Sequence, residues 1–200
     1  GELTISNTGI NMLDPGGTLW IKSINKRSPN FLFSNQIGGG FSSTTVDATD
    51  KSWNSKKLEN NYFSGQDPFY TLTKTGFILP SDSPCNDPAG YDYIAWQFVK
   101  KSGYHDVLQY IGNESTIPHS LGQAPALILV HQYFTMGEEG AYNWAVYHKA
   151  LGTSKYMMIN ETTAAISDNN VWSQEPDAEN FYVGSNPMVG GQTQYQIYSA

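Results

Sequence analysis

Four histidines are the residues of this chain that most readily bind metals or transfer protons, so their spacing is considered first. They are His105, His119, His131 and His148. A zinc site that can be recognised in a sequence has ligands paired at short intervals, as in HExxH, and these histidines form no such pair. His131 and His148 could still meet if they lie on neighbouring strands. The spacing itself predicts no metal site.

One histidine, His119, stands in the segment HSLGQAP and could be taken for a catalytic residue. Gly122 and Pro125 favour a tight connection between two strands there, with Leu121 packed beneath it. The simpler interpretation is that the His119 side chain hydrogen-bonds the backbone of this loop. We expect that structural role.

Adjacent carboxylates form the next candidate. Glu138 and Glu139 are neighbours in a glycine-flanked loop, whereas glycoside hydrolysis needs two carboxylates about 5–10 Å apart across a cleft. The chain also lacks the GxSxG, Walker and GxGxxG motifs of hydrolases and nucleotide-binding proteins. The sequence therefore predicts a protein that is not an enzyme and needs no cofactor.

The segment SDSPCNDPAGYD, residues 81–92, is rich in the oxygen ligands that Ca²⁺ prefers. Asp82, Asp87 and Asp92 are the calcium candidates, but acidic turn residues more often hold no ion, so we predict no metal. Cys85, the only cysteine, cannot form an intramolecular disulfide. We expect a buried, unreactive thiol, with intermolecular pairing or catalysis as the alternatives.

Aromatic residues outside the expected strands are candidates for an interaction surface, because exposed aromatic side chains tend to mark interfaces. An insertion at 56–75 supplies four of them and a long loop at 132–142 supplies three. They are Tyr62, Phe63, Phe69, Tyr70, Tyr133, Phe134 and Tyr142. Contact with another subunit is the favoured interpretation, and a platform for sugars is the alternative.

Net charge limits the partners. The 200 residues carry a formal charge of −7, which argues against nucleic acid, whose binding depends on Lys and Arg, and against an anionic membrane surface. No apolar run reaches the roughly 18–20 residues of a membrane span. The chain begins with Gly1 rather than Met, which indicates a processed product or a fragment.

The apolar runs are short, rich in β-branched and aromatic residues, and bounded by turn residues, which is typical of β-strands. Strands are expected in LTIS, TLWIKSI, FLFS, GFILPS and YDYIAWQFVK, and then in DVLQYIG, STIPHS, PALILVHQYF, NWAVYHK, YMMINE, FYVGS and TQYQIYS. Many short strands with turns between them predict an all-β sandwich or barrel. In YDYIAWQF, alternation puts Ile94, Trp96 and Phe98 on one face, which we expect to be the core face.

The two halves of the chain repeat one another. Five segments of the first half match segments of the second in the same order: 18–24 with 126–132, 30–35 with 143–149, the Trp53 segment with the Trp172 segment, 76–84 with 180–187, and YIAWQF with YQIYSA. This pattern is typical of a diverged duplication. We therefore predict two tandem, related β-sandwich-like units, jelly-roll or lectin-like, of about 100 residues each. The first is 1–100, with the insertion at 56–75, and the second is 101–200.

The second half resembles a β module that recurs in structural proteins of tailed phages, often marine phages. The resemblance covers about 95 residues well and the first half more loosely. The matching residues are Tyr110, Gly112, Ile117, His119, Leu121, Gly122, Pro125, Ile128, Val130, Trp144, Val146, Tyr147, His148, Leu151, Gly152, Lys155, Tyr156, Asn160, Thr162, Ala164, Phe181, Val183, Gly184 and Ser185. The usual closing TYVAY is QYQIY here, and the first half lacks the HxLGxxP opening.

This resemblance implies a non-enzymatic virion protein, as a capsid decoration, a head or tail fibre, or a tail component. Its partners would be other virion subunits, including copies of itself as a homo-oligomer, and its location the extracellular particle. The alternative is a carbohydrate-binding, lectin-like module that recognises a glycan on the host surface. A glycan-cleaving enzyme is the third hypothesis.

Overall fold

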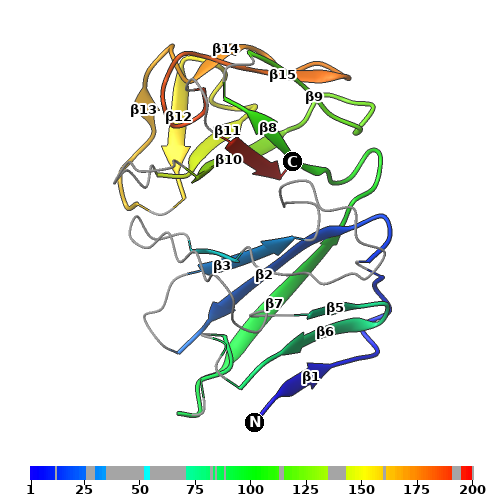
Figure 1. The fold of residues 1–200 in the computed structure, drawn as a ribbon. Helices are drawn as coiled ribbons and strands as arrows, with labels where there is room; N and C mark the ends of the chain where they lie inside the picture. Colours follow the sequence, from blue (N-terminus) through cyan, green and yellow to red (C-terminus); the bar gives the residue numbers. More distant parts are fainter. Residues whose placement is uncertain are drawn as a thin grey trace. The chain divides into compact units, whose positions relative to one another are not determined.

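The computed structural model describes residues 1–11, 13–25, 30–34, 52–54, 71–81, 83, 85–87, 89–112, 115–134, 143–159, 161–190 and 195–199. Within these residues the regular elements are the strands β1 to β16, and no helix is present (Figure 1). Every strand pairing is antiparallel. The predicted all-β class is therefore confirmed.

Contacts between residues group the chain into two compact units. The described residues up to Lys100 belong to unit 1, and those from Lys101 onwards belong to unit 2. Among the described residues, each unit contains one larger and one smaller antiparallel sheet.

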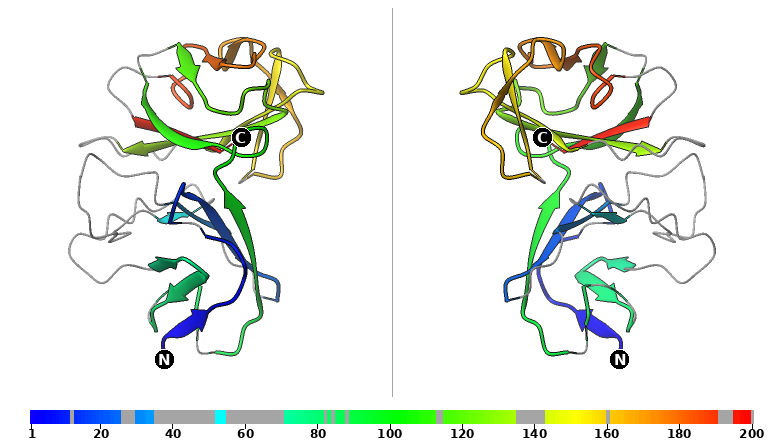
Figure 2. Two further views of the ribbon diagram at one scale, coloured as in Figure 1. Left: turned by 90° about the vertical axis from the view of Figure 1, so that its right-hand side faces the viewer. Right: turned by 90° about the vertical axis from the view of Figure 1, so that its left-hand side faces the viewer.

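The larger sheet of unit 1 has the strand order β4-β3-β2-β7 and the smaller sheet the order β1-β6-β5. The strands of the larger sheet are β4 (Ser52–Asn54), β3 (Asn30–Ser34), β2 (Gly17–Ser23) and β7 (Tyr93–Val99). Those of the smaller sheet are β1 (Leu3–Ile5), β6 (Gly76–Leu79) and β5 (Thr71–Thr73). Figure 2 shows β7, the long green strand of unit 1, at the border of its sheet beside the blue β2.

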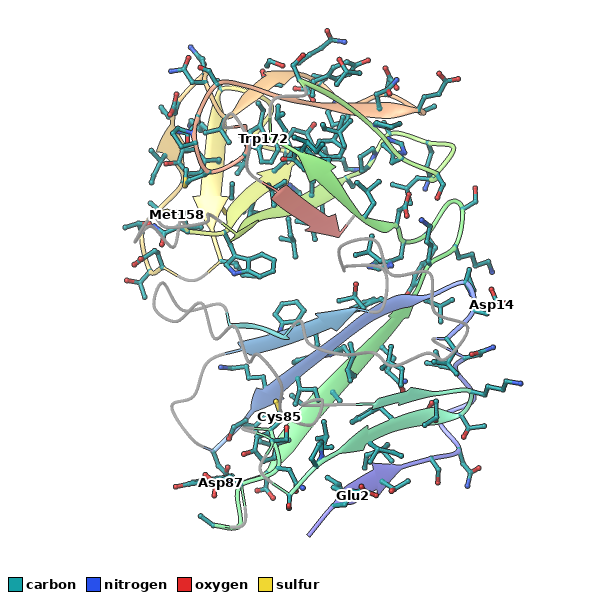
Figure 3. The ribbon with its side chains drawn as sticks, viewed as in Figure 1. Glu2, Asp14, Cys85, Asp87, Met158 and Trp172 are labelled. Carbon is teal, nitrogen blue, oxygen red and sulfur yellow. The ribbon has the colours of Figure 1, made fainter. Side chains whose placement is uncertain are left out.

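Both sheets of unit 1 contribute to one hydrophobic core. Leu19 and Ile21 of β2 are buried, while Trp20 between them is only half-buried, as expected for a strand with one core face. Leu72, Phe77 and Leu79 of the smaller sheet join the same cluster, with Cys85. Cys85, labelled in Figure 3, is fully buried, and burial raises the pKa of its thiol far above the ordinary value. The expected buried thiol is confirmed.

The face of β7 that enters this core is the opposite of the one predicted. Leu19 lies opposite Gln97 and Ile21 opposite Ala95, and residues directly opposite on paired strands share a face. Tyr93 and Val99 accordingly pack against the core cluster. The expectation that Ile94, Trp96 and Phe98 face the core is therefore wrong.

The larger sheet of unit 2 has the order β13-β12-β11-β10-β16-β8 and the smaller sheet the order β14-β15-β9. The larger sheet contains β13 (Ile166–Ser167), β12 (Lys155–Met158), β11 (Ala145–His148), β10 (Leu127–Phe134), β16 (Tyr195–Ser199) and β8 (Val107–Ile111). The smaller one contains β14 (Trp172–Gln174), β15 (Asn180–Val183) and β9 (Thr116–Pro118).

The core of unit 2 also draws on both of its sheets. Ile128 and Tyr147 of the larger sheet pack with Trp172 and Phe181 of the smaller one. The rings of Tyr147 and Trp172 meet edge to face with 5.7 Å between their centroids. Trp172, labelled in Figure 3, lies among these core side chains. Aromatic burial on this scale is a main source of stability in a β unit.

Strand order repeats between the units in part. The order β3-β2-β7 of unit 1 returns as β11-β10-β16 in unit 2, from segments that the sequence had matched. One match fails, because Trp53 lies in β4 of a larger sheet and Trp172 in β14 of a smaller sheet. The matched registers also differ, since Leu19 is fully buried whereas its counterpart Leu127 is 44% exposed. A shift of one residue reverses the face of every side chain in a strand.

Candidate functional site

The predicted aromatic surface can be followed only in part. Tyr62, Phe63, Phe69, Tyr70 and Tyr142 lie outside the described residues, as do Glu138 and Glu139. Tyr133 and Phe134 belong to strand β10, as the expected strand PALILVHQYF has them, so their assignment to the loop at 132–142 is wrong. The use of these seven residues as an interaction surface stays a prediction.

A different aromatic surface lies on unit 1, on the face of β2 and β7 that points away from the core. We call Ile24, Ile94 and Trp96 the outward patch, because they are 65%, 39% and 38% exposed. Ile94 lies opposite Lys22 in the ladder and Trp96 lies opposite Trp20. The Trp20 and Trp96 rings are tilted by 53°, with 5.4 Å between their centroids. Because exposed apolar patches on proteins tend to mark interaction sites, the outward patch is a candidate for one.

Polar contacts fix one end of the outward patch. The Ile24 N–H donates to the Asp92 carbonyl at 3.0 Å, which continues the ladder one pair beyond β2. The Asn25 amide donates to the Asp92 carboxylate at 2.9 Å, and the Asp92 N–H donates back to the Asn25 amide oxygen at 2.9 Å. This reciprocal pair holds a carboxylate at a defined place beside Ile24.

Basic residues stand at the other end of β7. The Lys100 N–H donates to the Gly16 carbonyl at 2.8 Å, which continues the ladder there, and Lys101 follows. The strand therefore runs from an acidic end at Asp92 to a basic end at Lys100. The alternation of large apolar residues along β7 was visible in the sequence, but the identity of the face they occupy was not.

The calcium candidates do not form a group. Asp82 lies outside the described residues. Asp87 accepts a hydrogen bond from the Ala89 N–H at 2.9 Å, which is an Asx turn, whereas Asp92 contacts Asn25. Among the described residues no cluster of three His, Cys, Asp or Glu side chains could hold a metal ion.

His119 takes part in the turn that contains it. His119 Nδ1 accepts a hydrogen bond from the Leu121 N–H at 3.3 Å, Leu121 is buried, and Gly122 has a φ of +71°. The predicted structural role of His119 in its turn is confirmed. Strands β10 and β11 are neighbours, but Leu127 is the residue opposite His148. His131 is four residues farther along β10, or about 13 Å, so the two histidines do not face each other.

One buried polar group was missed by the sequence reasoning. Asp106 is 1% exposed, and its Oδ2 accepts hydrogen bonds from the Ser120 N–H at 2.6 Å and the Ser120 hydroxyl at 2.8 Å. Its Oδ1 accepts from the Val107 N–H at 2.8 Å. Three donors satisfy a buried carboxylate, so Asp106 fastens the HSLG turn to the start of β8. No local pattern pointed to this contact, because Ser120 is fourteen residues from Asp106 in the sequence.

Unit 2 also contains two tyrosine–carboxylate pairs. Tyr147 donates its hydroxyl proton to Glu175. Tyr182 donates to Asp177 at 2.5 Å, and this bond is the main cause that lowers the pKa of Asp177 and raises the pKa of Tyr182. The Glu179 and Asn180 N–H groups also donate to Asp177. These bonds order the loop between β14 and β15.

The fold and surface define an all-β protein of antiparallel sheets, with an exposed aromatic surface on one sheet of unit 1. None of the described residues forms a helix that could cross a membrane. The chain belongs to the family described as a domain of unknown function, DUF7483, whose model matches residues 4–199. No curated protein and no solved structure matches the chain.

Proposed function

We propose that the chain is a non-enzymatic structural protein of a tailed-phage virion, such as a capsid decoration, a head or tail fibre, or a tail component. It acts by contact with other subunits of the particle. The observation that carries this proposal is the outward patch, where Ile94 and Trp96 project from a ladder of seven residue pairs. Burying one such side chain fully contributes about 1.5–3 kcal/mol.

The proposal includes two tandem, related sandwich-like units of about 100 residues. The repeated order of β3-β2-β7 and β11-β10-β16 supports it. Each unit also has one hydrophobic cluster to which both of its sheets contribute. Such units are rigid, and rigidity lowers the entropic cost of forming contacts in an assembly.

The direct test is to look for the chain in particles. Virions purified from a phage that encodes it would be analysed by mass spectrometry, and a tagged copy would be located by electron microscopy. A phage with Trp96→Lys should incorporate less of the chain than one with Asp87→Lys, which changes an aspartate of an Asx turn that is not part of the patch. Absence of the chain from purified particles would refute the proposal.

Carbohydrate binding is the second candidate, and the composition of the outward patch is what favours it. The ladder that carries the Trp20 and Trp96 indoles ends at the hydrogen-bonded pair Asn25 and Asp92, four residues along the chain from Trp96, and ligand sites combine an apolar surface with a few polar groups. A glycan array separates the two functions. Specific glycan binding by a monomer, lost in Trp96→Ala, would favour the lectin.

A further inference from the structure

The HSLG turn, residues 119–122, follows strand β9 and is closed by the imidazole of His119. Its Nδ1 accepts a hydrogen bond from the Leu121 N–H at 3.3 Å. A ring nitrogen that accepts a hydrogen bond carries no proton, so neutral His119 has its proton on Nε2. Nε2 is buried, and no described residue is its hydrogen-bond partner. The ring is therefore held through its acceptor nitrogen alone.

The same kind of bond occurs in unit 2 with an asparagine as the acceptor. The Met188 N–H donates to Asn186 Oδ1 at 3.0 Å, again across two residues. An amide oxygen keeps its lone pairs at any physiological pH, whereas a neutral imidazole gains a proton between about pH 8 and pH 5. His148 Nδ1 also accepts such a bond, from the Ala150 N–H at 3.2 Å, but Ala150 is exposed and water can replace that acceptor.

Leu121 connects the HSLG turn to the segment by which the chain enters unit 2. Its carbonyl accepts hydrogen bonds from the Gly103 N–H at 2.7 Å and from the Ser102 hydroxyl at 3.0 Å. The Gln123 amide donates to the Gly103 carbonyl at 2.9 Å, and the Leu121 side chain is buried. A displacement of Leu121 would therefore break the contacts that Ser102 and Gly103 make with the turn.

Protonation of His119 at Nδ1 replaces the acceptor of this bond by a donor. The new Nδ1–H and the Leu121 N–H would then point at each other. The imidazolium would have two N–H groups and, among the residues that the structure describes, no acceptor for either of them where the ring stands. A buried cation without hydrogen bonds is unfavourable, so the charged ring leaves this place and the Leu121 N–H loses its partner.

Charged and titratable groups reach the HSLG turn from two sides, the strand β15 with the loop before it and the residues before β8. They are Asp177, Glu179 and Tyr182, and then Lys101, His105 and Asp106. The pKa of Asp177 is lowered first by the Tyr182 hydroxyl, then by the Glu179 and Asn180 N–H groups, and also by the charge of His119. Asp177 therefore attracts the imidazolium in return.

We propose that His119 is a pH-sensitive latch, whose neutral ring closes the HSLG turn and whose protonation releases Leu121 together with Ser102 and Gly103. The release is local, because Ser120 is held to Asp106 by two hydrogen bonds in which His119 takes no part. The inference concerns a conformational change within unit 2, and it is independent of the virion proposal.

Amide hydrogen exchange, followed by NMR on the isotope-labelled full chain from about pH 8 to pH 5, tests the latch. Protection factors remove the pH dependence of the intrinsic exchange rate. Those of the Leu121 and Gly103 amides should fall about tenfold at the acid end, as expected for loss of a hydrogen bond at a buried residue. Those of the Ser120 and Met188 amides should not fall. Nitrogen spectra near pH 8 should show the His119 proton on Nε2.

The matched variant is His119→Asn, because an asparagine Oδ1 can accept the Leu121 N–H as Asn186 Oδ1 accepts that of Met188. Asparagine does not titrate, so this variant should protect Leu121 equally at both ends of the pH range. His148→Asn replaces the other turn histidine and should leave the pH dependence of the Leu121 protection as it is in the natural chain.

A Leu121 protection factor that does not change with pH in the natural chain would overturn the inference. So would the same pH dependence in His119→Asn, since the titrating group would then be another one, such as His105. Equal losses at Leu121, Ser120 and Met188 would show that acid opens the whole unit, and a His119 proton on Nδ1 near pH 8 would remove the acceptor itself. Either result would also refute the latch.

Discussion

The Asp106 carboxylate and the Ser120 hydroxyl form a buried hydrogen bond of 2.8 Å, and the Ser120 N–H donates to the same carboxylate oxygen at 2.6 Å. Fourteen residues separate them in the sequence. The contact joins the turn after β9 to the residue before β8, and it is closed to water because Asp106 is 1% exposed. It is a structural clamp of unit 2.

Removing the carboxylate should destabilise the protein strongly. Asp106→Ala leaves the Ser120 and Val107 donors without their partner in a buried place, and we expect a loss of about 3 kcal/mol of unfolding free energy. Ser120→Ala removes only the hydroxyl bond and should lower the unfolding free energy by about 1 kcal/mol. Urea denaturation measures both. Asp87→Ala, at a half-buried Asx turn, is the control, and an equal effect of Asp87→Ala and Asp106→Ala would contradict the clamp.

Because Trp96 faces outward, its loss should destabilise the protein less than the loss of a core residue. Trp96→Ala should lower the free energy of unfolding by only about 1 kcal/mol, because the Trp96 side chain is 38% exposed in the folded protein. Leu19→Ala, on the core face of the adjacent strand, should cost about 2–5 kcal/mol through loss of burial and the cavity it leaves. Urea denaturation measures the unfolding free energy of both variants, and a low protein concentration keeps association between molecules from contributing to it. A larger loss for Trp96→Ala would mean that Trp96 faces the core, as the sequence had predicted.

The Tyr182–Asp177 bond makes a prediction about pH. The folded-state pKa of Asp177 is lowered, first by the Tyr182 hydroxyl and then by the Glu179 and Asn180 N–H groups. The stability that the ionised Asp177 carboxylate contributes is therefore fully present above the pKa of an unfolded aspartate. It is lost as the pH falls through the lowered pKa of the folded state. An NMR titration should show the Asp177 pKa below that of a free aspartate. Tyr182→Phe should raise it, whereas Tyr91→Phe, in unit 1, should leave it unchanged.

Burial of Cys85 makes a prediction about reactivity. The thiol is fully buried, and burial raises its pKa, so the reactive thiolate is not accessible in the folded protein. A thiol reagent should react with native protein only at the rate of unfolding and with urea-unfolded protein at once. Rapid labelling of native protein, at a rate that destabilisation by Leu19→Ala does not change, would place the thiol at the surface.

Several elements could be predicted because they depend on local pattern. The run TLWIKSI became β2 and the run ALILVHQYF became β10, since a row of β-branched and aromatic residues fits a pleated, half-buried surface. The turn role of His119 followed from Gly122 and Pro125, which constrain the backbone themselves. By contrast β13, with two residues, and β14, with three, were missed, because such segments are too short to show a periodicity.

The candidate site was predicted less well. Alternation along β7 showed that Ile94, Trp96 and Phe98 share a face, but both faces of the strand contain large side chains, and the sequence favoured the wrong one. Asp106 carries no local signal at all, because its partner Ser120 reaches it only after the chain has turned back at β9.

The sequence by itself determined the all-β class, most of the strands and the pairing of side chains into faces, because each depends on residues that are neighbours in the chain. Only the tertiary structure decided which face of β7 is buried, which strands stand side by side and where β7 ends its sheet among the described residues. Those choices depend on the register between strands far apart in the chain, such as Trp20 with Trp96 and Val107 with Ser199. No local pattern encodes that register.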